Sequence, residues 1–227
     1  MKVVLFGASG MIGHGVLRAC LDDAGVESVI AVVRRPLAVQ HPKLHEVVPA
    51  DFTDLTDVAT SFDGTDACFF CLGAPSAGLT EAEYTRVTHD YALAAAHALL
   101  PLNDELTFVY VSGAGSDSAS TTMWARVKGR TEDALLALPF HAYIFRPAYI
   151  RPRQGARPGT RSYRLMYAAT SWLYPLLRRI FPKHTTTTDT LGRAMLGVTR
   201  LKGRGPRVLA STEINDLGAL PLAEGKS

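Results

Sequence analysis

Three glycines spaced three residues apart are the part of this sequence best suited to binding a ligand. Gly7, Gly10 and Gly13 follow an apolar run at residues 2–6 that predicts a buried parallel strand, and helical spacing of apolar residues begins inside the motif. The first glycine permits a tight turn, the second lets the backbone approach a pyrophosphate, and the third lets the helix pack on the strand. Free N–H groups and the helix dipole then face the phosphates. The motif predicts a dinucleotide site made by Gly7, Ser9, Gly10, Met11, Ile12 and Gly13.

Two arginines follow the second predicted strand, at the place where an NAD-selective protein carries an acid. The strand is predicted at residues 26–33, and Arg34 and Arg35 come directly after it. An Asp or Glu there would accept from the ribose 2′-hydroxyl and repel a 2′-phosphate, whereas arginines bind the phosphate through charge-assisted hydrogen bonds. The alternative is an ordinary solvated arginine pair in a loop. The pattern favours NADP(H) over NAD(H) as the cofactor.

The elements that must position these residues alternate between strand and helix along the chain. The predicted strands are residues 2–6, 26–33, 44–49, 67–72, 106–112 and 140–145. The predicted helices are residues 11 to about 25, 55–62, 81–100 and 122–138. Such alternation is typical of a doubly wound parallel sheet with right-handed crossovers. The sequence therefore predicts an α/β Rossmann fold with a small C-terminal helical cap.

The last third of the chain is predicted to be a substrate-side cap on the same domain. Residues 151–160 indicate a loop, about 161–180 and 187–201 two helices, and 207–210 a short strand. Too little chain follows the loop for an independent domain, so residues 1–227 are expected to form one domain with about 151–227 as the cap. Fourteen Lys and Arg residues and a single acid lie between residues 146 and 207, which fits a phosphate-rich ligand, an anionic surface or a solvated face.

The cysteines and the bulk composition indicate an ordinary cytoplasmic protein. Cys68 and Cys71 have the CxxC spacing of redox and metal sites, but they lie in a predicted buried strand, where positions three apart face opposite sides. They are therefore interpreted as core residues, and no metal site is predicted. No apolar run approaches the ~20 residues that span a bilayer, and no secretory signal is visible. The cytoplasm is thus the expected compartment.

Charge and composition give little information about binding partners. A formal net charge of +3 without a recognition motif does not favour nucleic acid. The apolar, aromatic and basic stretch at residues 171–181 leaves open a second copy of the chain or an anionic surface, although a cover over the substrate cleft is the preferred interpretation. The expected partners are a dinucleotide and a small-molecule substrate, with a homodimer or a regulatory protein left open.

Several stretches, taken in order, resemble the short-chain dehydrogenase/reductase superfamily in its extended and atypical branches, which include NAD-dependent epimerases and dehydratases. The glycine spacing is GxxGxxG, Ser112 stands where the superfamily carries its active-site serine, and Lys128 stands where its lysine binds the nicotinamide ribose. More narrowly, residues 127–129, 146–159 and 215–218 look like the atypical group around the Tat-interacting protein. The resemblance covers nearly the whole chain and implies further cofactor contacts: Asp51 and Phe52 at the adenine, Cys71, Leu72 and Gly73 over the cofactor, Val111 and Lys128 near the ribose, and Pro147, Ala148 and Ile150 at the nicotinamide.

Two positions depart from the superfamily's catalytic pattern. Its tyrosine, four residues before the lysine, gives or takes a proton as hydride moves, but here that position is Trp124. An indole N–H can donate a hydrogen bond but cannot act as a proton acid near neutral pH, and losing such a group lowers a rate by about 10²–10⁴. The superfamily's relay asparagine falls on Thr88.

The resemblance therefore leaves two functions open. In the first, the protein is an NADP(H)-dependent oxidoreductase or an epimerase/dehydratase acting on a small carbonyl or hydroxyl compound, with Ser112, Lys128 and Tyr149 as catalytic residues. In the second, it binds NADP(H) without turning it over and acts as a sensor or regulatory partner.

Overall fold

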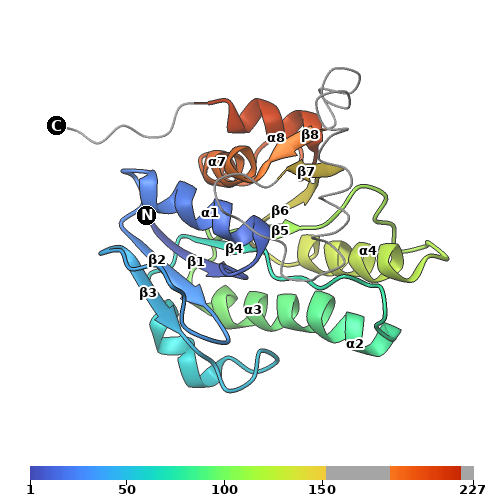
Figure 1. The fold of residues 1–227 in the computed structure, drawn as a ribbon, viewed down its shortest axis with the longest axis horizontal. Coiled ribbons are helices and arrows are strands. Elements are labelled where there is room, and N and C mark those ends of the chain that lie inside the picture. Colours follow the sequence, from blue (N-terminus) through green and yellow to red (C-terminus); the bar gives the residue numbers. More distant parts are fainter. Residues whose placement is uncertain (152–184, 221–227) are drawn as a thin grey trace.

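Within residues 1–151 and 185–220, which the computed structural model describes, seven parallel strands form a central sheet (Figure 1). Across the sheet the strands are β3 (Leu44–Val47), β2 (Ser28–Val32), β1 (Lys2–Phe6), β4 (Ala67–Phe70), β5 (Thr107–Val111), β6 (His141–Arg146) and β9 (Val208–Ala210). Every adjacent pair is parallel, so the carboxyl ends of all these strands meet at one edge. The sheet confirms the predicted doubly wound α/β fold, with the strand order reversing between β1 and β4. That reversal is where such sheets bind ligands.

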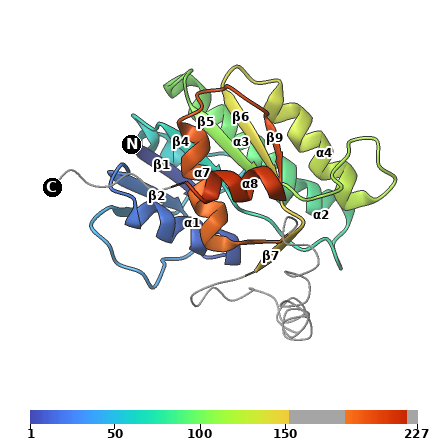
Figure 2. The same ribbon diagram turned by 90° about the horizontal axis from the view of Figure 1, so that it is seen from above.

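Helices cover both faces of the sheet, because successive strand side chains point to opposite sides. Val3 and Leu5 of β1 face one cluster, whereas Val4 and Phe6 face the other. The first face carries α1 (Met11–Asp22), α7 (Thr188–Thr199) and α8 (Ser211–Gly218), which lie together in Figure 2. The second face carries η1 (Thr56–Phe62), α2 (Glu81–Thr85), η2 (Arg86–Asp90), α3 (Tyr91–Leu99) and α4 (Met123–Leu136).

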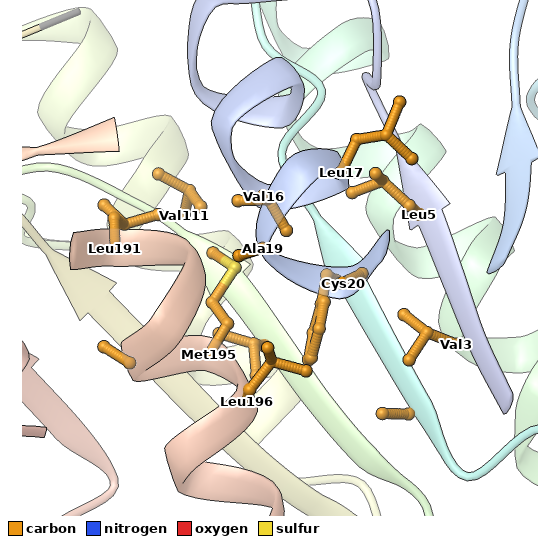
Figure 3. Packing of buried hydrophobic residues seen from close by; sticks show 14 of the residues in the cluster. Val3, Leu5, Val16, Leu17, Ala19, Cys20, Val111, Leu191, Met195 and Leu196 are labelled. Atoms are coloured by element: carbon orange, nitrogen blue, oxygen red, sulfur yellow. The ribbon is translucent and has the colours of Figure 1, made fainter. Parts of the chain in front are cut away.

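The C-terminal elements α7, α8 and β9 pack with the earlier part of the chain: α7 and α8 on the first face, and β9 at the edge of the sheet. Figure 3 shows Met195 and Leu196 of α7 beside Ala19 and Cys20 of α1. Close approach of the two helices requires Gly192, because a Cβ there would lie 2.8 Å from the Ala19 Cβ. Among the residues expected to form the cap, α7 packs on α1 and β9 pairs with β6.

The second face differs from the sequence expectation in its helices. Residues 56–62 form a 3-10 helix, preceded by Asp54, which accepts from both the N–H and the hydroxyl of Thr56. Such local side-chain bonds compete with the α-helical pattern. The single helix expected at 81–100 is divided, with the π-helical turn η2 between α2 and α3 and a 3-10 turn η3 (Leu100–Leu102) at its end. Both segments pack on the second face of the sheet.

Two further features were not predicted from the sequence. Strands β7 (Tyr149–Arg151) and β8 (Thr185–Thr187) form a separate parallel pair, and α8 follows β9. Three-residue strands are too short for hydrophobic alternation to identify them. The helix predicted at about 161–180, most of the loop at 151–160 and the stretch at 171–181 lie outside the described residues. Among the described helices, none has the length and apolar character needed to cross a membrane.

Candidate functional site

The glycine turn lies at the reversal point of the sheet. Gly7 has φ +82°, and a Cβ there would lie 2.7 Å from the Leu72 backbone nitrogen, in the loop after β4. A Cβ on Gly13 would lie 2.0 Å from the Gly7 carbonyl oxygen, so α1 sits directly on the turn. The Gly10 N–H donates to the same oxygen at 2.9 Å. Each predicted glycine therefore has a steric or hydrogen-bonding reason to be there.

The amino end of α1 is open toward a ligand. Gly10 is its N-cap residue, no side chain caps it, and its first turn holds no acid. The first N–H groups of a helix have no intrahelical partner, so this end provides donors and a positive dipole for phosphate. Ser9 beside it is exposed, and a Cβ on Gly73 in the facing loop would meet nothing within 4 Å.

The residues expected at the adenosine end are partly brought together. Arg34 and Arg35 are exposed after β2, and neither makes an ion pair with any residue that the structure describes. Asp51, after β3, is also exposed; the Thr53 N–H hydrogen bond lowers the pKa of its carboxyl group, and Arg86 lies 3.5 Å away. Phe52 is instead buried, with its ring centroid 5.5 Å from that of Tyr91. Of the predicted pair, only Asp51 is presented at the surface.

Ser112, directly after β5, belongs to a buried polar network. Its hydroxyl donates to the carboxylate of Glu132, which is 1% exposed and which also accepts from Arg146 Nε at 3.0 and 3.1 Å and from its Nη2. Ser116 Oγ lies 2.9 Å from Ser112 Oγ and donates to the Gly113 carbonyl. The serine hydrogen is thus directed at a carboxylate, a stronger acceptor than a neutral carbonyl.

Lys128 of α4 comes to the same place as Ser112. Its amino group donates to the Val111 carbonyl at 3.2 Å and lies 5.4 Å from the ring centroid of the buried Tyr110. Desolvation among these groups lowers the pKa of Lys128 to about 8, against an opposing attraction from Glu132. The structure therefore brings together two of the three predicted catalytic residues, one directly after β5 and one on α4.

Replacing Lys128 with methionine is expected to raise the free energy of unfolding at pH 7 by roughly 1–3 kcal/mol. The folded pKa of Lys128 is about 8 against an ordinary value of 10.5. Between these values the unfolded chain holds a proton that the folded chain lacks, so the wild type gains stability as pH rises and the variant does not. Urea unfolding should show that the two proteins differ less in free energy of unfolding at pH 10 than at pH 7. An equal difference at both pH values would contradict the prediction.

Trp124, one turn before Lys128, lies over the loop that follows Ser112. A Cβ on Gly113 would be 3.9 Å from its ring, and a Cβ on Gly115 would be 3.6 Å away. Thr88, at the predicted relay position, is buried in η2, and its carbonyl accepts from the Tyr110 hydroxyl at 3.4 Å. A buried tyrosine therefore occupies the space between the Thr88 carbonyl and the lysine.

The turn expected at the nicotinamide is held from both sides. The Pro147 carbonyl accepts from the Ala114 N–H at 3.2 Å, and the Ala148 N–H donates to Ser211 Oγ at 3.0 Å. Tyr149 and Ile150 continue into β7, where Tyr149 pairs with Thr185. The third predicted catalytic residue is thus fixed on the small sheet rather than on α4.

Of the two CxxC cysteines, Cys68 is buried in the core, as the sequence predicts, whereas Cys71 lies directly after β4 and is partly buried. Cys68 belongs to the cluster under α3 and α4, whereas Cys71 packs on the α1 side with its Sγ 4.0 Å from Met195 Sδ. Burial raises the pKa of both thiols. In the described part of the chain, no group of three or more His, Cys, Asp or Glu side chains could hold a metal ion.

Glu132 and Arg146 are site residues that the sequence reasoning missed as a pair. Glu132 lies four residues after Lys128 on α4, and this spacing places both side chains on one face of the helix. An acid on the helix face that carries the predicted catalytic lysine was the available signal. No buried ion pair was predicted for Arg146.

Comparison with known proteins places these features in a family. The family model described as "NAD(P)H-binding" matches residues 7–155. Protein HTATIP2 of Rattus norvegicus is 31% identical over 162 residues, which is 70% of this chain and 66% of the rat protein. The Leucinostatins biosynthesis cluster protein T of Purpureocillium lilacinum is 28% identical over 61% of this chain and 52% of its own length. The matched region thus spans just under two thirds of the first relative and about half of the second.

Solved structures agree on the fold. A short-chain dehydrogenase/reductase family oxidoreductase from Burkholderia thailandensis superposes with a TM-score of 0.72 at 16% identity, covering 94% of this chain and 92% of that one. MoeE5, in complex with UDP-glucose and NAD, superposes with a TM-score of 0.68 at 18% identity, covering 92% of this chain and 75% of that one. At these identities the likeness shows the Rossmann fold alone.

One expectation from the sequence is wrong. "Protein FMP52, mitochondrial" of Meyerozyma guilliermondii is 24% identical over 95% of this chain and 94% of its own length, and further relatives carry the same mitochondrial name. This finding overturns the cytoplasmic assignment, which rested on composition and on the lack of a visible signal. With the glycine turn, the parallel sheet and the family match together, the chain belongs to the NAD(P)H-binding family as an atypical short-chain dehydrogenase/reductase.

Proposed function

We propose that the protein is an NADP(H)-dependent oxidoreductase acting on a small carbonyl or hydroxyl compound. The observation that carries this proposal is that the glycine turn, Ser112 and Lys128 all lie at the carboxyl edge of one parallel sheet. The amino end of α1 would hold the pyrophosphate of a dinucleotide, and the residues after β5 would then lie on the nicotinamide side of the reversal point. Similar solved structures that hold NAD support the placement.

The preference for NADP(H) is proposed from the exposed arginines. Arg34 and Arg35 follow β2 without an ion-pair partner among the described residues, and the strand end presents no acid to a ribose 2′-hydroxyl. Their guanidinium groups are therefore available to a 2′-phosphate.

Replacing Arg34 with glutamate is expected to weaken NADPH binding by about 10- to 100-fold, because a charge-assisted hydrogen bond becomes a repulsion. NADH, which lacks the 2′-phosphate, should change far less. Titration calorimetry with both cofactors measures the two effects. Arg18→Glu, an equal charge reversal at an exposed position on α1, is the matched control. Equal losses for NADPH and NADH would contradict the 2′-phosphate assignment.

A bound nicotinamide would supply or accept hydride at the substrate carbon, and a protein group would have to supply or accept the accompanying proton. Trp124 cannot do so, and the hydrogen of Ser112 is directed at Glu132. Tyr149, the first residue of β7 and next to the turn at the proposed nicotinamide position, carries the remaining hydroxyl group among the predicted catalytic residues. We assign the proton-transfer role to Tyr149. Lys128 keeps its proposed role of binding the nicotinamide ribose.

A second function, an NADP(H)-binding regulatory protein, is favoured by the same hydrogen bond. With Ser112 donating to Glu132 and Trp124 in place of the tyrosine, neither usual hydroxyl donor is free for a substrate carbonyl. The cofactor site does not depend on either group. A protein of this kind would bind NADPH, and a partner would read its bound state.

An assay of NADPH consumption with a panel of small aldehydes and ketones separates the two functions. Slow turnover is expected, below about 0.1 per second, since a typical kcat near 10 per second loses 10²-fold or more without its acid. Tyr149→Phe should abolish that turnover while leaving NADPH binding unchanged. NADPH binding without turnover on any compound would instead support the regulatory function.

A further inference from the structure

The arginines after β2 stand on a short arch that is fixed to β3 at both ends. Before the arch, the Val33 N–H donates to the Val47 carbonyl at 3.0 Å. After it, the Leu37 N–H donates to the carboxylate of Glu46, with the two oxygens at 3.1 and 3.2 Å. Residues 34–36 between these anchors are exposed. The backbone that carries both arginines is therefore positioned by the neighbouring strand.

Glu46 differs from the acid that an NAD-selective site would need. It lies on β3 opposite Ala31 of β2, one strand away from the position that contacts a ribose. Both of its oxygens face a single backbone N–H, and it makes no ion pair with a described residue. Its carboxylate is thus committed to the backbone rather than to a ligand.

We propose that Glu46 is a positioning residue for cofactor selectivity, holding Arg34 and Arg35 where they meet the adenosine 2′-phosphate. The inference rests on the proposed NADP(H) preference and adds the residue that produces it. Fixing a loop in its binding conformation before the ligand arrives removes part of the ordering cost of binding. An arch anchored only at Val33 would have to be ordered by the phosphate itself.

The proposal predicts an effect on one part of the cofactor only. Loss of the Glu46 acceptor frees the arch, so affinity for the 2′-phosphate falls while affinity for the rest of the adenosine stays the same. A site in which Glu46 contacted the ribose would behave in the opposite way, because its loss would weaken a ligand without the 2′-phosphate.

Titrations with adenosine 2′,5′-bisphosphate and adenosine 5′-monophosphate isolate that part. The wild type should bind the bisphosphate more tightly. Glu46→Ala should reduce the ratio of bisphosphate affinity to monophosphate affinity by about fivefold, which corresponds to the loss of one hydrogen bond. Only the affinity for the bisphosphate should change. Glu46→Gln keeps a carbonyl acceptor for Leu37 and should keep the ratio. Glu46→Thr, which suits a strand but is too short to reach Leu37, is a second loss variant, and Asp104→Ala is an exposed acid-to-alanine control.

The outcomes are distinguishable. A wild type that binds both probes equally overturns the NADP(H) preference and this inference with it. A wild type that prefers the bisphosphate, with an unchanged ratio in Glu46→Ala and Glu46→Thr, overturns the inference alone. Equal weakening of both probes, or a glutamine variant as impaired as the alanine variant, would also contradict it, since either result indicates a general effect on the fold or the charge.

Discussion

Replacing Arg146 with methionine is expected to lower the free energy of unfolding by about 3–5 kcal/mol, because it leaves the Glu132 carboxylate buried without its counter-ion. Glu132 is 1% exposed, whereas the Arg146 side chain is 33% exposed. Removing the carboxylate instead, in Glu132→Gln, leaves a guanidinium that can reach water. That variant should therefore lose less, about 1–3 kcal/mol. Urea unfolding of the two variants tests the asymmetry.

The double variant Glu132→Leu/Arg146→Met is the control for this prediction. Buried ion pairs replaced as a unit by apolar residues often cost little stability. We expect the double variant to be more stable than Arg146→Met alone. A double variant as unstable as Arg146→Met would show that packing, rather than the unpaired charge, causes the loss.

Replacing Gly13 with alanine is expected to abolish measurable NADPH binding and to lower the free energy of unfolding by about 3 kcal/mol, the upper end for overpacking. The new Cβ would lie 2.0 Å from the Gly7 carbonyl oxygen and 2.6 Å from its carbon. Both contacts are with backbone atoms of Gly7, which cannot rotate aside as a side chain can. Helix α1 must therefore move away from the glycine turn.

Gly197→Ala provides the matched control. At that position in α7 the nearest atom to a Cβ is 3.6 Å away, an ordinary contact, and alanine favours a helix over glycine. This variant should keep wild-type NADPH affinity and be at least as stable. Calorimetric titration and thermal unfolding check both variants, and full NADPH binding by Gly13→Ala would contradict the placement of the pyrophosphate.

The sheet and the glycine turn could be predicted from the sequence because both depend on local signals. Buried parallel strands such as β1 and β5 are continuous apolar runs, and Gly7 and Gly13 stand at fixed distances from the first of them. The order of elements along the chain then limited the topology, and the structure confirms it. Each of these inferences used residues close together in the sequence.

The parts that the sequence did not predict depend on contacts between distant residues. Glu132 and Arg146 are 14 residues apart, on α4 and β6, and neither type of residue is expected in a core. The hydrogen bond from Ser112 to Glu132 likewise joins separate elements, so the serine could be placed but its partner could not. The burial of Phe52 against Tyr91 is a third case, because the sequence alone does not distinguish a Phe that packs in the core from one that contacts a ligand.

Calorimetric titration of the unmodified protein with NADPH and with NADH tests the central claim most directly. The glycine turn and the uncapped amino end of α1 predict saturable, equimolar NADPH binding. The arch that carries Arg34 and Arg35 predicts that this binding is at least about tenfold tighter than NADH binding. Equal affinities would contradict the role of the arginines, and no binding of either cofactor would contradict the site itself.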